Sequence, residues 1–142
     1  MRCEKVMKHQ IASVSEDDSV QRAALLMREE NVGFLPVLDE EGRVIGAITD
    51  RDIAIRVCAE DGGARETPIG DVMTREVVAC GPNDDLAHAE SLMSLYRKSR
   101  LMVVSGEGQL LGVISLSDIV ERDSNRHAAR TLRKIVSREY RF

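Results

Sequence analysis

Two short stretches of the sequence carry side chains that could hold a nucleotide. In each one a hydroxyl residue stands three positions before an aspartate: Thr49 before Asp52, and Ser115 before Asp118. A hydroxyl can bond a phosphate or sugar oxygen, and an ionised carboxylate can accept hydrogen bonds from both hydroxyls of a ribose. An apolar run precedes each stretch and predicts a strand leading into a helix, whose first N–H groups would be open to an anion. The pattern therefore predicts two nucleotide sites.

Helix capping is the alternative interpretation of the same residues. Ser, Thr and Asp are the usual residues at helix N-termini, because their oxygens accept hydrogen bonds from the first backbone N–H groups. Capping alone would explain a single hydroxyl-x-x-Asp stretch. Its recurrence at the same place in two copies favours a binding site.

Both stretches belong to an internal repeat. A shift of 66 residues places Val6–Ala54 on Val72–Val120 without a gap, and 14 of the 49 aligned positions are identical. A repeat of this length is a whole supersecondary unit, and such units commonly bury their apolar faces against their neighbours. We therefore expect repeat one with its linker at 1–66, repeat two at 67–125 and an additional helix at 126–142.

Each repeat is predicted to run strand, helix, strand, strand, helix after a short helical turn. The central helices follow Ser19 and Asp85, which are suitable N-caps. Asp50 or Thr49 is expected to cap the helix after the first hairpin, and Ser117 the equivalent helix of repeat two. The predicted strands are Ile11–Val14, Phe34–Leu38 and Arg43–Thr49 in repeat one, and Val77–Ala79, Leu101–Val104 and Leu110–Ile114 in repeat two.

The helix beyond the repeats is predicted to serve assembly. Its apolar stripe would be left in water on an isolated monomer, and an exposed apolar face usually marks a contact surface. Its basic residues are expected to be solvated rather than bound to nucleic acid. The stripe consists of Ala128, Leu132, Ile135 and Val136, continued by Tyr140 and Phe142.

The composition argues against several classes of function. The chain is 43% apolar and 31% charged, which is ordinary for a soluble globular protein. Its net charge of −4 gives no overall attraction to nucleic acid or an anionic membrane, and no apolar run approaches the ~20 residues that span a bilayer. The three histidines lack partners at metal-ligand spacing, so no metal site is predicted. The odd set of cysteines, in which Cys58 is expected to be a helix core residue, fits a reducing cytoplasm: Cys3, Cys58 and Cys80.

These features together resemble a tandem pair of cystathionine-β-synthase (CBS) domains, also called a Bateman module. Further marks are Val6-Met7 and Val72-Met73 before each first strand, and Gly33-Phe34-Leu35-Pro36-Val37 in a second strand. The resemblance covers Val6 to Arg122. It implies an α/β (α+β) fold with two pseudo-symmetric βαββα repeats packed sheet to sheet. It also implies two clefts between the repeats that bind adenosine-containing ligands, and a disc-shaped homodimer of two modules.

Carried onto this sequence, the resemblance assigns a role to each site residue. The hydroxyl residues would contact ribose or phosphate, the aspartates would hold the ribose hydroxyls, and the backbone at the start of each second strand would border the adenine. The residues are Thr49 and Ser115, then Asp52 and Asp118, then Gly33-Phe34 and Ser99-Arg100.

The two predicted sites differ in charge. Arg100 stands where repeat one has Phe34, and its guanidinium is a candidate phosphate partner. Arg51 lies inside the first motif, where it either reaches a phosphate or forms a surface salt bridge with Asp50. We therefore expect one site to bind more tightly than the other.

We interpret the chain as a stand-alone regulatory module that binds AMP, ADP or ATP and changes its shape or its affinity for a partner. No acid–base pair, activated nucleophile or metal set is visible, so no catalysis and no required cofactor are predicted. The expected partners are the nucleotide, a second copy of the chain and an unidentified regulated protein. The alternatives are a dimerisation or interaction module whose clefts stay empty, and a binder of NAD or S-adenosylmethionine.

Overall fold

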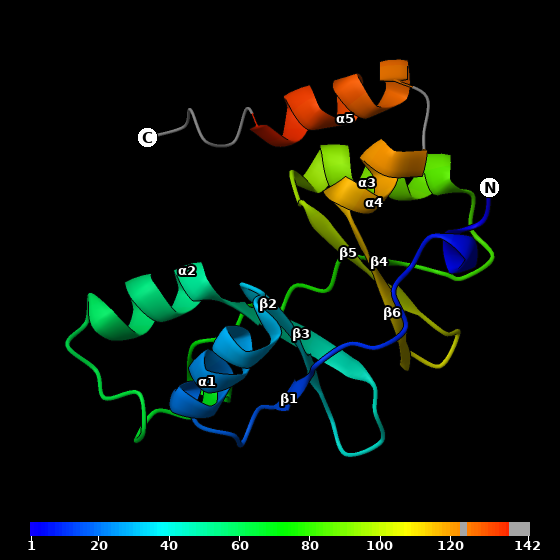
Figure 1. Cartoon of the computed structure of the whole chain (residues 1–142). Helices are drawn as coiled ribbons and strands as arrows, with labels where there is room; N and C mark the ends of the chain where they lie inside the picture. Colours follow the sequence, from blue (N-terminus) through cyan, green and yellow to red (C-terminus); the bar gives the residue numbers. More distant parts are fainter. Residues whose placement is uncertain (123–124, 137–142) are drawn as a thin grey trace. The chain divides into compact units, whose positions relative to one another are not determined.

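The structure is a computed structural model that describes residues 1–122 and 125–136, with backbone alone at 125–128 and 136. Its elements follow the predicted order twice and end in an additional helix (Figure 1). Repeat one contains η1 (Cys3–Lys5), β1 (Val14–Ser15), α1 (Val20–Glu30), β2 (Phe34–Leu38), β3 (Val44–Thr49), α2 (Asp50–Ile53) and the π-helical turn η2 (Ala54–Cys58). Repeat two contains η3 (Ile69–Asp71), β4 (Ala79–Cys80), α3 (Leu86–Tyr96), β5 (Arg100–Val104), β6 (Leu110–Ser115) and α4 (Leu116–Arg122), and α5 (Asn125–Val136) follows. The predicted mixed α/β class, with two βαββα repeats and a C-terminal helix, is confirmed.

Each repeat builds a three-stranded mixed sheet with the same topology. The first strand pairs parallel to the second, and the second pairs antiparallel to the third in a hairpin. The first strands, β1 and β4, are two residues long and lie at or beyond the end of the predicted runs. They are short because only Val14–Ser15 and Ala79–Cys80 have a hydrogen-bonding partner in the neighbouring strand.

The described chain divides into two compact units that do not follow the order of the repeats. One unit is Ala12–Val77, and the other combines Met1–Ile11 with Val78–Phe142. The segments that open the repeats, residues 3–8 and 69–74, are called here the leading segments. Each contains a single 3₁₀ turn followed by Val-Met. Each leading segment lies in the unit of the other repeat, so the boundary between units differs from the boundary between repeats.

Short backbone bridges attach the leading segments to their units. Lys8 and Val113 exchange both of their backbone hydrogen bonds, at 2.9 and 3.1 Å, and Thr74 and Ala47 do the same at 2.9 and 3.0 Å. The glycine next to each bridge makes room for the segment. A Cβ on Gly112 would lie 2.5 Å from Met7 Sδ, and one on Gly46 would overlap the carbonyl oxygen of Thr74. Only glycine allows so close an approach to a strand.

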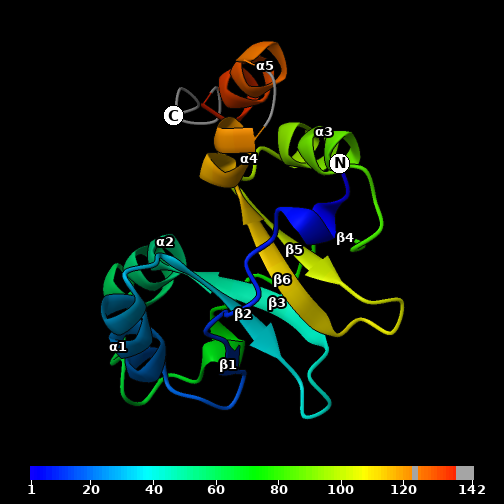
Figure 2. The ribbon, with the colours of Figure 1, turned by 45° about the vertical axis from the view of Figure 1, so that its right-hand side comes forward.

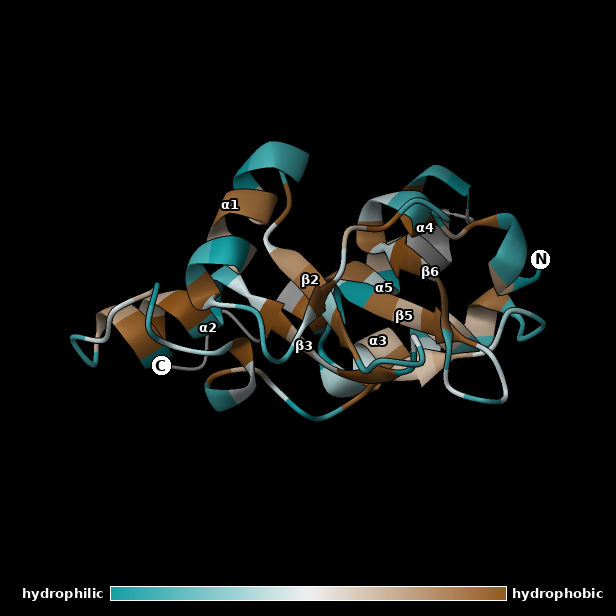
Figure 3. Cartoon of the chain, turned by 90° about the horizontal axis from the view of Figure 1, so that it is seen from below, coloured by the Kyte–Doolittle hydropathy of each residue, from teal (hydrophilic) through white to brown (hydrophobic). Residues whose placement is uncertain are grey.

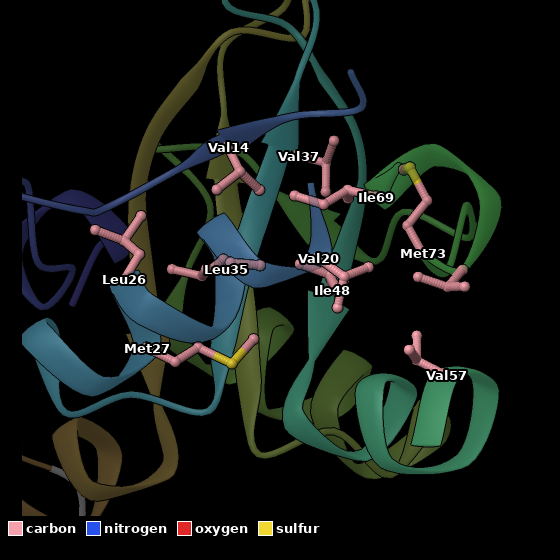
Figure 4. Packing of buried hydrophobic residues seen from close by; sticks show 12 residues of the cluster. Val14, Val20, Leu26, Met27, Leu35, Val37, Ile48, Val57, Ile69 and Met73 are labelled. Atoms are coloured by element: carbon pink, nitrogen blue, oxygen red, sulfur yellow. The ribbon is translucent and has the colours of Figure 1, made fainter. Parts of the chain in front are cut away.

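Apolar residues of one leading segment complete the core of the Ala12–Val77 unit. Apolar and polar residues alternate along the ribbon of helix α1 (Figure 3). Helices α1 and α2 lie on one side of the sheet formed by β1, β2 and β3 (Figure 2). Its apolar side meets Leu35 and Ile48 of the hairpin, and Ile69 and Met73 of the leading segment join the same cluster (Figure 4). Burial of these side chains supplies the main force that holds the segment in place.

The other unit closes its core with α5, so the predicted apolar stripe is not left wholly in water, and the role of the helix in assembly stays a prediction. Helix α5 covers α3 and α4 (Figure 1). Ile135 is 3% exposed and belongs to the core of this unit, and buried Thr131 donates a hydrogen bond to buried Glu90 at 3.4 Å. Of the predicted stripe, Leu132 remains 42% exposed. The buried side is therefore rotated toward Thr131, which supplies a donor to the Glu90 carboxylate. The side chains of Ala128 and Val136, and residues Tyr140 and Phe142, lie outside the described residues.

The three cysteines occupy different environments. Cys3 of η1 and Cys80 of β4 are buried with their sulfurs 3.6 Å apart, whereas Cys58 is exposed, contrary to its predicted core position. The Cys80 thiol donates to Cys3, which lowers the pKa of Cys3 despite its burial. The same bond, together with burial, raises the pKa of Cys80.

We expect one fast-reacting thiol in the native chain. Cys58 should react at once with an aromatic disulfide reagent at pH 8, because reaction needs an accessible thiolate. Cys3 and Cys80 should react only when their unit opens or unfolds. Spectrophotometric counting before and after addition of denaturant checks this, and Cys58→Ser should abolish the fast phase. Three fast thiols in the native chain would contradict the described burial.

Candidate functional site

In repeat one, Thr49 and Asp52 bind each other across the start of α2. The Thr49 hydroxyl accepts a hydrogen bond from the Asp52 backbone N–H at 3.1 Å, and Asp52 Oδ2 accepts one from the Thr49 N–H at 3.0 Å. This reciprocal pair is a capping box. The capping interpretation of the motif is therefore correct, and Thr49 rather than Asp50 is the N-cap.

The other oxygen of Asp52 faces side chains alone. The Thr74 hydroxyl donates to Asp52 Oδ1 at 3.3 Å, and Arg56 Nε lies 3.9 Å from the same oxygen. The Arg56 guanidinium is itself held by the carbonyls of Val72 and Met73, at 2.9 and 3.0 Å. The Asp52 side chain is only 11% exposed. One oxygen is thus tied to the backbone, and the other meets groups that a ligand could displace or bridge.

Repeat two reproduces the arrangement with Ser115 and Asp118. Asp118 Oδ2 accepts hydrogen bonds from the Ser115 N–H and hydroxyl, both at 2.8 Å, and the Ser115 hydroxyl lies 3.2 Å from the Asp118 backbone nitrogen that donates to it. Ser117, which the sequence suggested as the cap, instead shares a hydroxyl–hydroxyl bond of 2.8 Å with Ser115. The prediction for Ser117 is wrong because the helix begins at Leu116, two residues before the start that a Ser117 cap implies.

A lysine of the leading segment faces the free oxygen of Asp118. Lys8 Nζ lies 3.8 Å from Asp118 Oδ1, and the Lys8 side chain is 70% exposed. Lys8 and Thr74 are equivalent positions of the repeat. Each leading segment therefore brings one side chain to the aspartate of its unit. Neither residue was predicted from the sequence, although the alignment of the two repeats places them in register.

The predicted adenine-bordering residues lie beside the motif in each unit. Phe34 pairs with Thr49 across the hairpin, and Arg100 pairs with Ser115. The carbonyls just before these strands accept hydrogen bonds from the first residue of the following helix, at 3.0 Å from Asp50 to Gly33 and at 2.8 Å from Leu116 to Ser99. The fold thus brings the predicted residues of each site together within its own unit.

Fewer backbone N–H groups are open to an anion at the helix starts than the sequence predicted. The N–H groups of Asp52 and Asp118 bond the motif hydroxyls, and the N–H of Arg51 bonds Asp50 Oδ1 at 2.9 Å. The Arg51 side chain is exposed, and among residues 1–122 and 125–136 it forms no ion pair with Asp50. Ligand contacts at these motifs would therefore come mainly from side-chain oxygens and cations.

The described part of the chain contains no group of three His, Cys, Asp or Glu residues that could hold a metal ion. His88 lies 4.0 Å from Asp84 without a third such partner. No helix among the described residues is long and apolar enough to cross a membrane.

Comparison with known proteins assigns both repeats to one kind of domain. The family model of the CBS domain matches residues 3–58 and 69–125. The chain is 40% identical over 130 residues to the CBS domain-containing protein YhcV of Bacillus subtilis, covering 91% of each chain. It is 33% identical over 129 residues to the inosine-5'-monophosphate dehydrogenase of Korarchaeum cryptofilum, of which it spans 26%.

One of the similar solved structures contains bound ligands. The CBS domain pair of protein MJ0100 superposes with a TM-score of 0.76 at 26% identity, over 85% of this chain and 94% of that one. It was solved in complex with 5'-methylthioadenosine and S-adenosyl-L-methionine. Both of those ligands contain adenosine.

Proposed function

Since this chain belongs to the CBS domain family, we propose that it is a regulatory module whose two repeats each bind an adenosine-containing ligand. One observation carries the proposal. In both units the aspartate of the hydroxyl-x-x-Asp motif uses one oxygen to fix the backbone and leaves the other facing side chains. That second oxygen is suited to accept hydrogen bonds from ribose hydroxyls. The adenosine ligands of the MJ0100 pair support the choice of ligand class.

AMP, ADP and ATP are the ligands that we favour, and the module needs no cofactor to act. Cations beside both aspartates support a phosphate-bearing ligand in at least one repeat. We infer that ligand binding changes the affinity of the module for a regulated protein and that the module itself catalyses no reaction. The proposed working state is a homodimer. The proposed compartment is the cytoplasm, since the free thiols suit a reducing environment.

A ligand panel in a thermal-shift experiment tests the function. A ligand at a hundredfold its Kd should stabilise the full chain by about 2.7 kcal/mol, because it binds only the folded state. The panel contains AMP, ADP, ATP, NAD and S-adenosylmethionine, with ribose 5-phosphate as the control that lacks adenine. A melting temperature unchanged by the whole panel would overturn the proposal and favour the ligand-free interaction module.

Arg100 is predicted to contact phosphate. It lies opposite Ser115 at the start of β5 and is partly exposed. Arg100→Ala should weaken ATP binding about threefold to tenfold, because it removes one partly exposed contact between a cation and a phosphate. Adenosine binding should be nearly unchanged. Calorimetric titration with both ligands measures this. Lys98→Ala, which removes a nearby cation before the strand, is the control, and equal losses for ATP and adenosine would remove Arg100 from the phosphate site.

A further inference from the structure

The two motifs carry different charges, and from this difference we propose that the repeats select differently charged adenosine ligands. The site of repeat two favours a phosphate-bearing ligand, and the site of repeat one favours a ligand without phosphate. This inference rests on the proposed function and specifies which ligand chemistry each repeat takes. The residues that set the preference are Lys8 in one unit and Asp50 in the other.

Lys8 places an exposed cation at the repeat-two site. Its ammonium lies 3.8 Å from Asp118 Oδ1 on a side chain that is 70% exposed. Its backbone is fixed by the two bonds to Val113. A ligand whose ribose hydroxyls bind Asp118 would take over that oxygen and leave the ammonium beside it for a phosphate. The equivalent residue in repeat one is Thr74, which has no charge.

Asp50 places a carboxylate at the repeat-one site. A Cβ on Gly33 would lie 2.5 Å from Asp50 Oδ2, so this carboxylate lies against the backbone that is predicted to border the adenine. Its other oxygen accepts the Arg51 N–H at 2.9 Å. Asp50 directly follows Thr49, the predicted ribose or phosphate contact, so its carboxylate would repel a phosphate held there. Repeat two has the neutral Leu116 at the equivalent position.

The remaining charges around the motifs strengthen the contrast. Repeat one adds Arg51 and Arg56 to its two aspartates, so cations and carboxylates are equal in number. Arg56 is also held by two carbonyl oxygens. In repeat two the equivalent positions carry three cations, Lys8, Arg100 and Arg122, against two carboxylates, Asp118 and Glu121. The charges at these positions therefore sum to a positive value in repeat two and to zero in repeat one, and Lys8 is the cation seen beside Asp118.

Exchange of equivalent residues between the repeats tests the inference. Lys8→Thr gives repeat two the residue of repeat one, and Thr74→Lys is the reciprocal change. Methyl NMR of Ile119 and Ile53, which follow the two aspartates, reports each site separately during titration of the full chain with adenosine and with AMP. The measured quantity is the preference for AMP over adenosine at each site.

We expect the wild-type preference for AMP to be larger at the site reported by Ile119. Lys8→Thr should lower it there by roughly fivefold or more, as expected for a charge-assisted contact to phosphate, and leave the Ile53 site unchanged. Thr74→Lys and Asp50→Leu should each raise the preference at the Ile53 site. Raising the salt concentration to 0.5 M should reduce these differences.

The outcomes separate this inference from the proposed function. If both sites bind adenosine and AMP with equal preference, and the exchanges change nothing, the selection by charge is wrong while the function stands. If neither site binds adenosine or AMP, the proposed function fails and the inference with it. Lys8→Gln, which keeps a longer side chain, provides a second variant if Lys8→Thr lowers the stability of the unit, and an unchanged preference in Lys8→Gln would also contradict the inference.

Discussion

Gly46→Ala and Gly112→Ala are expected to lower the free energy of unfolding by about 1–3 kcal/mol each, the usual cost of forcing atoms into a packed site. A methyl group on Gly46 would overlap a backbone oxygen of the leading segment, and one on Gly112 would lie 2.9 Å from the Lys8 carbonyl oxygen. Since backbone atoms cannot turn aside as a flexible side chain can, the segment must move away from the strand.

Urea unfolding measures the loss, and amide exchange at residues 3–8 and 69–74 locates it. Gly106→Ala is the matched control, because a Cβ at Gly106 meets nothing within 4 Å and this glycine lies in a hairpin turn. We expect faster exchange in residues 69–74 for Gly46→Ala and in residues 3–8 for Gly112→Ala. If Gly46 and Gly112 tolerate Ala as well as Gly106 does, the leading segments are not held against the strands as described.

Asp52→Ala and Asp118→Ala are expected to weaken binding of an adenosine ligand at the altered repeat by about 1.5–3 kcal/mol, the range for hydrogen bonds to a charged group. Each change should also lower stability by roughly 1 kcal/mol through loss of the cap. This loss is expected because both aspartates also hold the start of their helices. The hydrogen bonds at 3.0 Å to Thr49 and 2.8 Å to Ser115 show that both aspartates do so.

A second pair of aspartates separates the two effects. Asp18 and Asp84 are also equivalent in the repeat, and each accepts a backbone N–H in a turn, at 2.9 Å from Ser15 and 2.8 Å from Gly81. Asp18→Ala and Asp84→Ala should therefore lower stability without changing ligand affinity. Unchanged affinity in both Asp52→Ala and Asp118→Ala would remove the ribose role, whatever their effect on melting.

The sequence predicted the architecture because its signals are local. The alternation of apolar runs, turns and caps repeats after 66 residues, so an element identified in one copy supports its counterpart in the other. The grouping of Phe34 with Thr49 and of Arg100 with Ser115 also follows from hairpin register. Short first strands were placed less well, since Val14–Ser15 and Ala79–Cys80 depend on pairing to a distant strand.

What the sequence could not predict depends on contacts between distant segments. No local pattern indicates that residues 3–8 pack with repeat two and residues 69–74 with repeat one. Lys8 and Thr74 therefore escaped notice as neighbours of the aspartates. The C-terminal helix was misjudged for a similar reason. Its apolar spacing predicts a buried side, but only the position of Glu90 on α3 explains why Thr131 is buried and Leu132 is exposed.

The most direct test of the central claim is calorimetric titration of the full chain with the adenosine ligands of the panel, before and after Asp118→Ala. The wild-type chain should bind up to two equivalents saturably, and Asp118→Ala should lose the equivalent held by repeat two while it remains folded. The claim is contradicted if AMP, ADP, ATP, NAD and S-adenosylmethionine all fail to bind the wild-type chain saturably at millimolar concentration, or if Asp52→Ala and Asp118→Ala both bind as the wild type does.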